Sequence, residues 1–162
     1  MRDGAIQAGI DKAISAGIAK TEDQLSEREF ERVRDAGAGT TQWLTAALAA
    51  AGTEYSCFAA IAAPTLASNK TAVFYAVTLN TVPVNVSLLR FRLGGATGNM
   101  IGEFDTQKLL GCQEMIGYFS TPMIIGPTDI FAAHVMCIVA SAVAENIVLH
   151  GFTIEPKGQT IL

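Results

Sequence analysis

The sequence predicts a mainly β protein, an antiparallel β-sandwich or jelly roll, with an α-helical N-terminal arm. Isoleucines near the N-terminus recur at four-residue steps, as along one side of a helix. After residue 53, short runs rich in β-branched and aromatic residues are separated by Pro, Gly and Asn, which favour turns. Strands without strong intervening helices are typical of sandwiches and jelly rolls. We therefore divide the chain into a helical arm, residues 1–52, and a β-sandwich body, residues 53–162.

The predicted arm begins with a weak amphipathic helix. Its apolar residues lie along one stripe, while Gly4, Gly9 and Gly17 each cost the helix up to about 1 kcal/mol relative to Ala. Such a helix is marginal alone, so we expect it to become ordered when it docks against another surface. The stripe consists of Ile6, Ile10, Ile14 and Ile18.

Two further helices are predicted before residue 53. Residues 26–37 begin with acidic residues and end with arginines and Gly37, which is typical of a solvent-exposed helix, and Phe30 lies on its narrow apolar side. Residues 42–51 follow a short linker and contain Trp43, the single tryptophan. We expect Phe30 and Trp43 to be large anchors, either into the body or into a neighbouring subunit.

The body is predicted to contain about seven strands. In residues 84–93 the apolar positions change from even to odd at Leu88 and Leu89, as a β-bulge requires, which leaves Arg90 and Arg92 on one outward face. The long segment of residues 130–144 is apolar on both alternating faces, so one face needs a partner besides its own core. Residues 108–117 fit either a helical turn or a loop. The predicted strands are residues 54–62, 71–79, 84–93, 100–104, 122–125, 131–143 and 146–155.

Arg90 and Arg92 stand out because the body contains few other charges. The pair fits three roles. The two arginines are edge charges that discourage strand addition, or a salt-bridge anchor to an acidic patch on a partner, or a contact to nucleic acid.

No set of side chains predicts a catalytic, cofactor or metal site. The glycines of residues 94–100 lack the Lys and Ser or Thr of a phosphate-binding loop and predict a hairpin turn instead. His134 and Cys137 are three residues apart on a predicted strand, so they face opposite sides of the sheet. We therefore expect a protein that is not an enzyme. The cysteines have no paired spacing and are interpreted as buried thiols, namely Cys57, Cys112 and Cys137.

Charge is distributed unevenly along the chain. Of 26 charged side chains, 14 lie in the first 37 residues, and the other 125 residues carry 12, about 10% against roughly 25% in an ordinary soluble domain. A surface so poor in charge is expected to be covered by neighbouring subunits. The net charge of −4 argues against a nucleic-acid-binding module, and the apolar content of 50% argues against disorder. No secretory signal is visible, which predicts that the protein is made in the cytoplasm.

A helical arm, a charge-poor β body over residues 54–155 and the lack of an active-site pattern together resemble the head decoration, or cement, proteins of tailed bacteriophages. The resemblance implies a structural virion protein, made in the host cytoplasm, that binds major capsid or other virion structural proteins and forms a homo-oligomer. It would stabilise the shell through apolar and β interfaces, without specific nucleic acid, membrane or cofactor. The alternative is a stand-alone oligomeric jelly-roll binding module. The predicted interface residues are Ile6, Ile10, Ile14, Ile18, Phe30, Trp43, Arg90 and Arg92.

Overall fold

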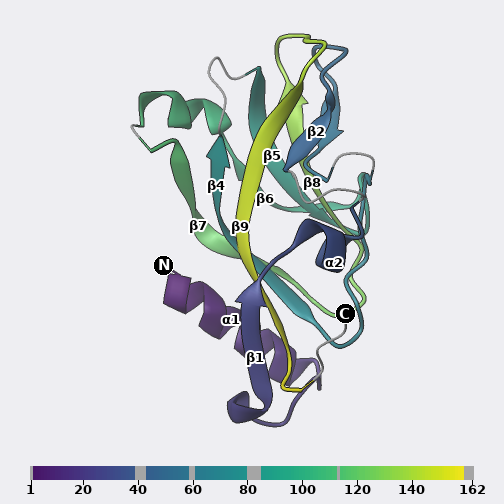
Figure 1. Cartoon of the computed structure of the whole chain (residues 1–162), viewed down its shortest axis with the longest axis vertical. Coiled ribbons are helices and arrows are strands. Elements are labelled where there is room, and N and C mark those ends of the chain that lie inside the picture. The colour runs from purple at the N-terminus through teal and green to yellow at the C-terminus, as the bar shows by residue number, and fades with distance from the viewer. Residues whose placement is uncertain (1, 39–42, 59–60, 80–84, 113, 159–162) are drawn as a thin grey trace.

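Two antiparallel sheets pack face to face in the computed structural model, which describes residues 2–38, 43–58, 61–79, 85–112 and 114–158 (Figure 1). The first sheet has the order β1-β9-β4-β7, with β2 also paired to β9, and the second has the order β3-β8-β5-β6. The predicted β-sandwich is confirmed. The strands are β1 (Leu25–Glu29), β2 (Leu44–Ala47), β3 (Glu54–Ser56), β4 (Thr71–Leu79), β5 (Val86–Leu93), β6 (Asn99–Phe104), β7 (Ile116–Ile125), β8 (Phe131–Cys137) and β9 (Ala144–Pro156).

The strand pairings are nested along the chain. β2 pairs with β9, β3 with β8, β4 with β7 and β5 with β6, all antiparallel. One long hairpin that folds over on itself gives this pattern, and two four-stranded sheets formed in this way are a jelly roll. β1 is an additional strand that extends the same edge of β9 on which β2 lies.

Aromatic side chains fill the space between the sheets. Phe74, Phe91 and Phe131 are at most 1% exposed and come from both sheets. Phe74 packs at 5.6 Å from Phe91 and Phe30 at 4.8 Å from Phe74, measured between ring centroids. Tilted and edge-to-face aromatic pairs of this kind add about 0.5–1.5 kcal/mol each to the burial of apolar area. The core therefore joins the first sheet, the second sheet and the chain that follows β1.

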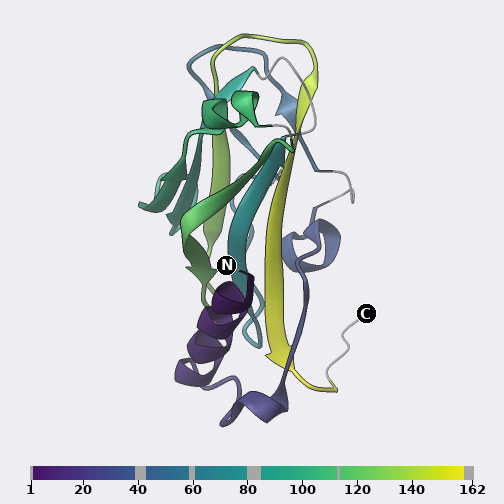
Figure 2. The ribbon, with the colours of Figure 1, turned by 90° about the vertical axis from the view of Figure 1, so that its left-hand side faces the viewer.

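The N-terminal helix α1 (Arg2–Ser15) lies against the outer face of the first sheet, next to β4 and β9 (Figure 2). Its isoleucines form a second small core with Leu25, Phe152 and Ile154. At Gly9 the helix is so close to the sheet that a Cβ atom would lie 2.6 Å from Val73 Cγ2. The helix is confirmed, and it lies against another surface as expected, one that β4 and β9 of the same chain supply.

The other two predicted helices are wrong. Residues 25–29 form β1 and residues 44–47 form β2, and both pair with β9. Of the helix predicted over residues 26–37, only the short α2 (Arg32–Ala36) is present, and it ends at Gly37, which has a positive φ of 66°. Local helix propensity is weak, and pairing with β9 outweighs it here. The predicted boundary at residue 53 therefore does not separate helix from strand.

Within the body, most strand predictions are confirmed. Residues 71–79 match β4, and the bulge lies between Ser87 and Leu89, where Leu88 has a positive φ of 42°. Gly94 and Gly95, both with positive φ, form the turn from β5 to β6. The ambiguous residues 108–117 divide between the short 3₁₀ helix η2 (Thr106–Gly111) and the start of β7. β8 ends at Cys137 instead of residue 143, so the apolar residues that follow it lie in a loop.

Candidate functional site

The predicted interface residues lie in three separate places. The stripe of Ile6, Ile10, Ile14 and Ile18 packs in the small core beneath α1. Phe30 is 7% exposed and belongs to the main core, and Trp43 packs against that core at 6.4 Å from Phe30 and 6.0 Å from Phe58, between ring centroids. These apolar anchors therefore bind their own chain. They do not form a common surface for a partner.

Arg90 and Arg92 do share one outward face, as predicted, and both contact Glu54 of β3. Arg90 Nη1 lies 2.6 Å from Glu54 Oε1, Arg92 Nη1 lies 2.8 Å from Glu54 Oε2, and Arg90 Nε donates to Glu103 at 2.7 Å. Burial alone would raise the pKa of Glu54, but the hydrogen bonds and charges of Arg92 and Arg90 outweigh burial and lower this pKa. The edge interpretation is wrong, because β5 lies between β8 and β6. The acidic groups that pair with these arginines belong to the same chain.

A larger group of ion pairs surrounds the fully buried carboxylate of Asp35 in α2. Lys70 Nζ donates to Asp35 Oδ1 at 3.1 Å, and Thr153 Oγ1 donates to Oδ2 at 3.1 Å. Arg34 Nη2 lies 3.0 Å from Oδ2, and Arg28 bridges Asp35 and Glu155. The cluster fastens α2 and β1 to β9, which is a structural role.

Arg32, in the same helix, has an unusual environment. Its side chain is almost fully buried and lies over Trp43, with its guanidinium carbon 5.3 Å from the ring centroid. Nη2 donates to the Leu44 carbonyl oxygen at 3.3 Å, while Nε and Nη1 have no partner among the described residues. Burial lowers the pKa of Arg32.

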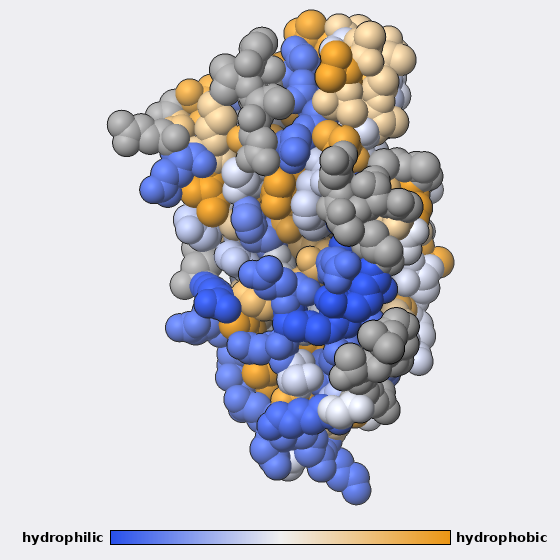
Figure 3. Space-filling view, in the orientation of Figure 1, coloured by the Kyte–Doolittle hydropathy of each residue, from blue (hydrophilic) through white to orange (hydrophobic). Residues whose placement is uncertain are grey.

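Two neighbouring segments at one end of the molecule lack charged side chains. The loop of residues 138–143, between β8 and β9, contains no charged residue, and neither do residues 46–53, which form the end of β2 and the loop that leads to β3. They lie side by side, since Ser141 N donates to Leu48 O at 2.7 Å and Gly52 N donates to Cys137 O at 2.8 Å. We call these two loops the tip. Figure 3 shows its apolar surface at the top right, opposite a hydrophilic lower end.

Three apolar side chains of the tip are exposed to solvent. Ile138 is 42%, Val139 55% and Val143 68% exposed. Beside them lies a shallow hollow of about 340 Å³, which is lined only by small residues, Ala47, Ala49, Ala140, Ser141 and Ala142. A patch of this kind has both projecting apolar groups and a recess, which suits contact with another protein surface.

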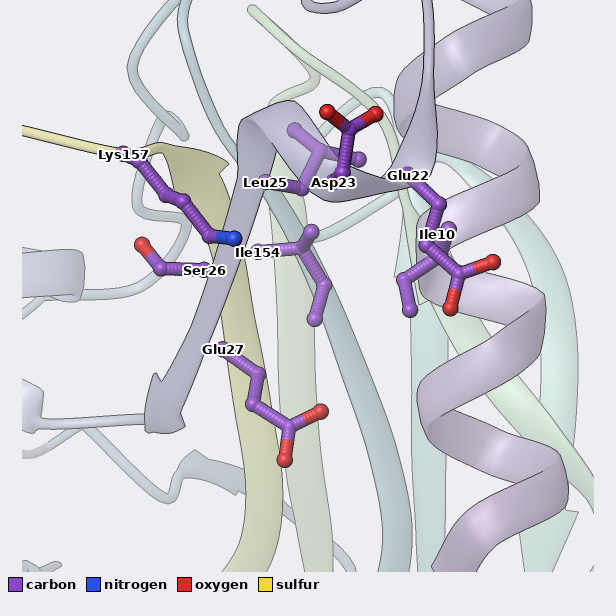
Figure 4. A pocket seen from close by; sticks show the side chains of 8 residues that line it. All are labelled: Ile10, Glu22, Asp23, Leu25, Ser26, Glu27, Ile154 and Lys157. Atoms are coloured by element: carbon purple, nitrogen blue, oxygen red, sulfur yellow. The ribbon is translucent and has the colours of Figure 1, made fainter.

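Two other hollows contain polar groups. At the lower end, a cavity of about 360 Å³ has an apolar floor of Ile10, Leu25 and Ile154. The carboxylates at its rim point in different directions (Figure 4). A second cavity of about 290 Å³ lies along β9 where β1 ends. It is lined by Glu29, Phe30, Trp43, Tyr75, Val148, Leu149, His150, Gly151 and Phe152.

The candidate base and nucleophile, His134 and Cys137, are not placed for nucleophilic catalysis. His134 faces outward, where its Nε2 lies 2.8 Å from the Ala62 carbonyl oxygen, while Cys137 faces the core, so their predicted separation is confirmed. Burial raises the pKa of Cys57 to about 12 despite the opposing charge of Arg32. Cys57 and Cys137 are buried as predicted, but Cys112 is exposed, so that prediction is wrong.

Within the described ranges, no group of three His, Cys, Asp or Glu side chains is arranged to hold a metal ion. None of the helices described is long and apolar enough to cross a membrane. No family model, curated protein or solved structure matches this chain.

Sequence reasoning missed the tip, although two signals pointed to it. Residues 130–144 are apolar on both faces, and the tip contains the end of that run. The alanine-rich residues 46–51 fall within the helix predicted over residues 42–51, and a helical pattern does not reveal their exposure. Both tip loops belong to the charge-poor part of the sequence. The charge count therefore indicated the part of the chain that contains the tip, but not the residues that form it.

Proposed function

We propose that this chain is a structural virion protein, a head decoration or related shell protein, that holds neighbouring protein subunits through apolar contacts. The observation that carries the proposal is the tip, where exposed Val139 and Val143 lie in the loop of residues 138–143, and neither this loop nor the neighbouring residues 46–53 contain a charged residue. A free monomer gains nothing from exposing apolar side chains in this way, whereas a subunit in contact with neighbours buries them.

The architecture supports the same proposal. Jelly rolls form the domains of many viral capsid proteins, and also of lectins and cupins. A fold alone does not determine function, so this analogy supports the proposal only together with the tip. The structural role needs a rigid block, and the sandwich with α1 packed on its first sheet and the Asp35 cluster supplies one.

The proposed mechanism is physical. Burial of apolar area contributes about 25 cal/mol per Å² before the cost of association is subtracted, so a small contact is weak in isolation. In a shell, each copy is held at a high effective concentration by its neighbours, and weak contacts add up to a stable lattice. Such a protein needs no cofactor and no metal ion.

The test is co-sedimentation of the purified full-length chain with shells of the source particle from which this protein has been removed. We expect saturable binding at a fixed ratio of copies to major capsid subunits. A soluble acidic protein of similar size serves as the control for trapping in the pellet. Absence of binding, or binding that does not saturate, would overturn the proposal.

One observation favours the alternative, a stand-alone oligomeric binding module. The cavity beside Trp43 has aromatic walls from Tyr75 and Phe152 and polar groups from Glu29 and His150, a mixture common in ligand sites. A binding module predicts a stable small oligomer that does not co-sediment with shells, so the same experiment separates the two functions.

A further inference from the structure

We propose that the tip of one copy binds the tip of a second copy of this chain, around a two-fold axis. This inference deepens the proposed function. It rests on that function in one respect, since both assign the tip to contact with another protein. It names the occupant of this surface as an identical tip.

The distribution of charge is the first argument for a second copy. A two-fold contact brings the same patch of both copies together, so any net charge in the patch is opposed by like charge. Loops 46–53 and 138–143 are free of charge, so this penalty is absent. Figure 3 shows an apolar surface at the tip and a mostly hydrophilic lower end, so a tip-to-tip arrangement also keeps the hydrophilic lower ends of the two copies far apart.

The shape of the tip is the second argument. A self-complementary patch must present both a projection and a recess, because each copy supplies what the other receives. The projecting side chains, Val139 and Val143, lie beside the hollow of about 340 Å³ with its lining of small residues. The recess on one copy can thus receive a valine of the other without displacing a large side chain.

The tip loops are also held in position within the single chain, before any second copy binds. Its two loops are joined by backbone hydrogen bonds from Ser141 N to Leu48 O and from Gly52 N to Cys137 O. Leu48, beneath the surface, is fully buried. Loops that are already held in position lose less conformational entropy when they bind, which favours association.

Another exposed apolar region lacks these features. Tyr118, 53% exposed, lines a cavity with Glu103, Asp105 and Lys108, and Met100, 57% exposed, lies on β6, the strand that contains Glu103. Charges that are interspersed with apolar groups keep such a surface solvated. This region therefore provides matched control positions for substitutions in the tip.

The size of the tip sets the expected strength of the contact. Its two loops together have fourteen residues, whereas a standard stable interface uses roughly 20–30 residues on each side. We therefore expect a reversible monomer–dimer equilibrium that depends on concentration, with the dimer favoured when copies are crowded on a shell.

The experiment is analytical ultracentrifugation of the full chain, alone, from about 1 μM to about 1 mM, a range that covers weak dissociation constants. We expect the mass to rise from one copy to two. The double variant Val139→Asp/Val143→Asp is expected to weaken association at least tenfold, since it places like charges at the axis. Met100→Asp, at a comparably exposed apolar position outside the tip, is expected to associate like the unmodified chain.

A second variant keeps the test independent of charge. Ala49→Gln fills the hollow with a neutral side chain and is expected to weaken association as well. Circular dichroism and urea unfolding check that each variant is folded. The proposal is overturned if the unmodified chain stays monomeric throughout, if it forms a trimer or ring, or if the double variant dimerises normally.

These outcomes are separate from the test of the proposed function. Dimers that fail to bind shells would leave the tip contact in place and refute the shell role. Binding of a strictly monomeric chain to shells would support the shell role and refute the tip contact.

Discussion

The two ends of this jelly roll are built in different ways. At the lower end, α1 covers the first sheet, and ion pairs around Asp35 connect β1, α2 and β9. At the tip, two short loops carry exposed valines and alanines and no charge. At the lower end, the apolar residues of α1 are covered by their own chain, and the buried charges are paired with one another. The tip leaves apolar side chains uncovered.

This difference shows that an amphipathic pattern in the sequence does not by itself identify a surface that contacts other proteins. The isoleucine stripe looked like a docking element, yet β4 and β9 already cover it. The tip has no periodic pattern, yet it is where apolar surface remains open. We expect the lower end to stabilise the fold and the tip to associate with other copies.

The largest expected effect is at the centre of the ion cluster. Asp35→Asn removes the negative charge that faces Lys70, Arg28 and Arg34 while it keeps the size of the side chain. Buried charges that lose a partner typically destabilise a protein by about 3–5 kcal/mol, and we expect a loss in this range, measured by urea unfolding.

The matched control for this prediction is Glu31→Gln. Glu31 pairs with Arg34 at 3.0 Å, but its side chain is 48% exposed. Exposed pairs contribute about 0–1 kcal/mol, so this variant should unfold almost like the unmodified chain. Equal losses in both variants would show that burial of the cluster does not decide its contribution.

The next effect concerns how closely α1 approaches the sheet. In Gly9→Ala the new methyl group would lie 2.6 Å from Val73 Cγ2 and 3.0 Å from Ile154 Cγ1, so we expect a loss of about 1–3 kcal/mol from overpacking. Gly4 has nothing within 4 Å of such a methyl group. Gly4→Ala should therefore stabilise the helix, by about 0.5–1 kcal/mol in urea unfolding. A loss in both variants would contradict this placement of α1.

The same comparison explains how much the sequence could predict. The strands of the body follow from alternation and turn residues, and the bulge at Leu88 is visible as a shift of parity. The strands β1 and β2 are not visible in the sequence, because Leu25–Glu29 and Leu44–Ala47 have local patterns that suit helices. They become strands only because β9, about a hundred residues later, offers an edge to pair with.

The candidate site was harder to predict for a related reason. Arg90 and Arg92 were correctly placed on one face, but their partner Glu54 lies on β3, which reaches β5 only through β8. Exposure of the tip depends on where β8 ends, and the apolar run continues past Cys137 without any break in its pattern. Contacts between distant strands decide both features, and a single sequence does not encode them in a local signal.

A smaller effect depends on pH at the side of the sandwich. Burial lowers the pKa of His150, although Glu29 opposes this, and the ring hydrogen-bonds to Thr78 Oγ1 at 2.7 Å. The unfolded chain has a histidine pKa near 6.5, so below about pH 6.5 it binds more protons than the folded chain. We expect stability to fall as the pH drops from about 7.5 to 5.5, and His150→Gln to remove part of that fall. An identical pH dependence of urea unfolding in both chains would contradict the prediction.

The smallest expected effect on stability is at the tip. Val143 is 68% exposed, so Val143→Asp removes little buried apolar area and places a charge in water. Substitutions at such positions usually change the free energy of unfolding by less than about 0.5 kcal/mol, and we expect this result at a concentration where the chain is monomeric. At high concentration the unmodified chain should gain stability from association, whereas the variant should not. A large loss in the dilute monomer would mean that Val143 stabilises its own chain, and the contrast between the two ends would then disappear.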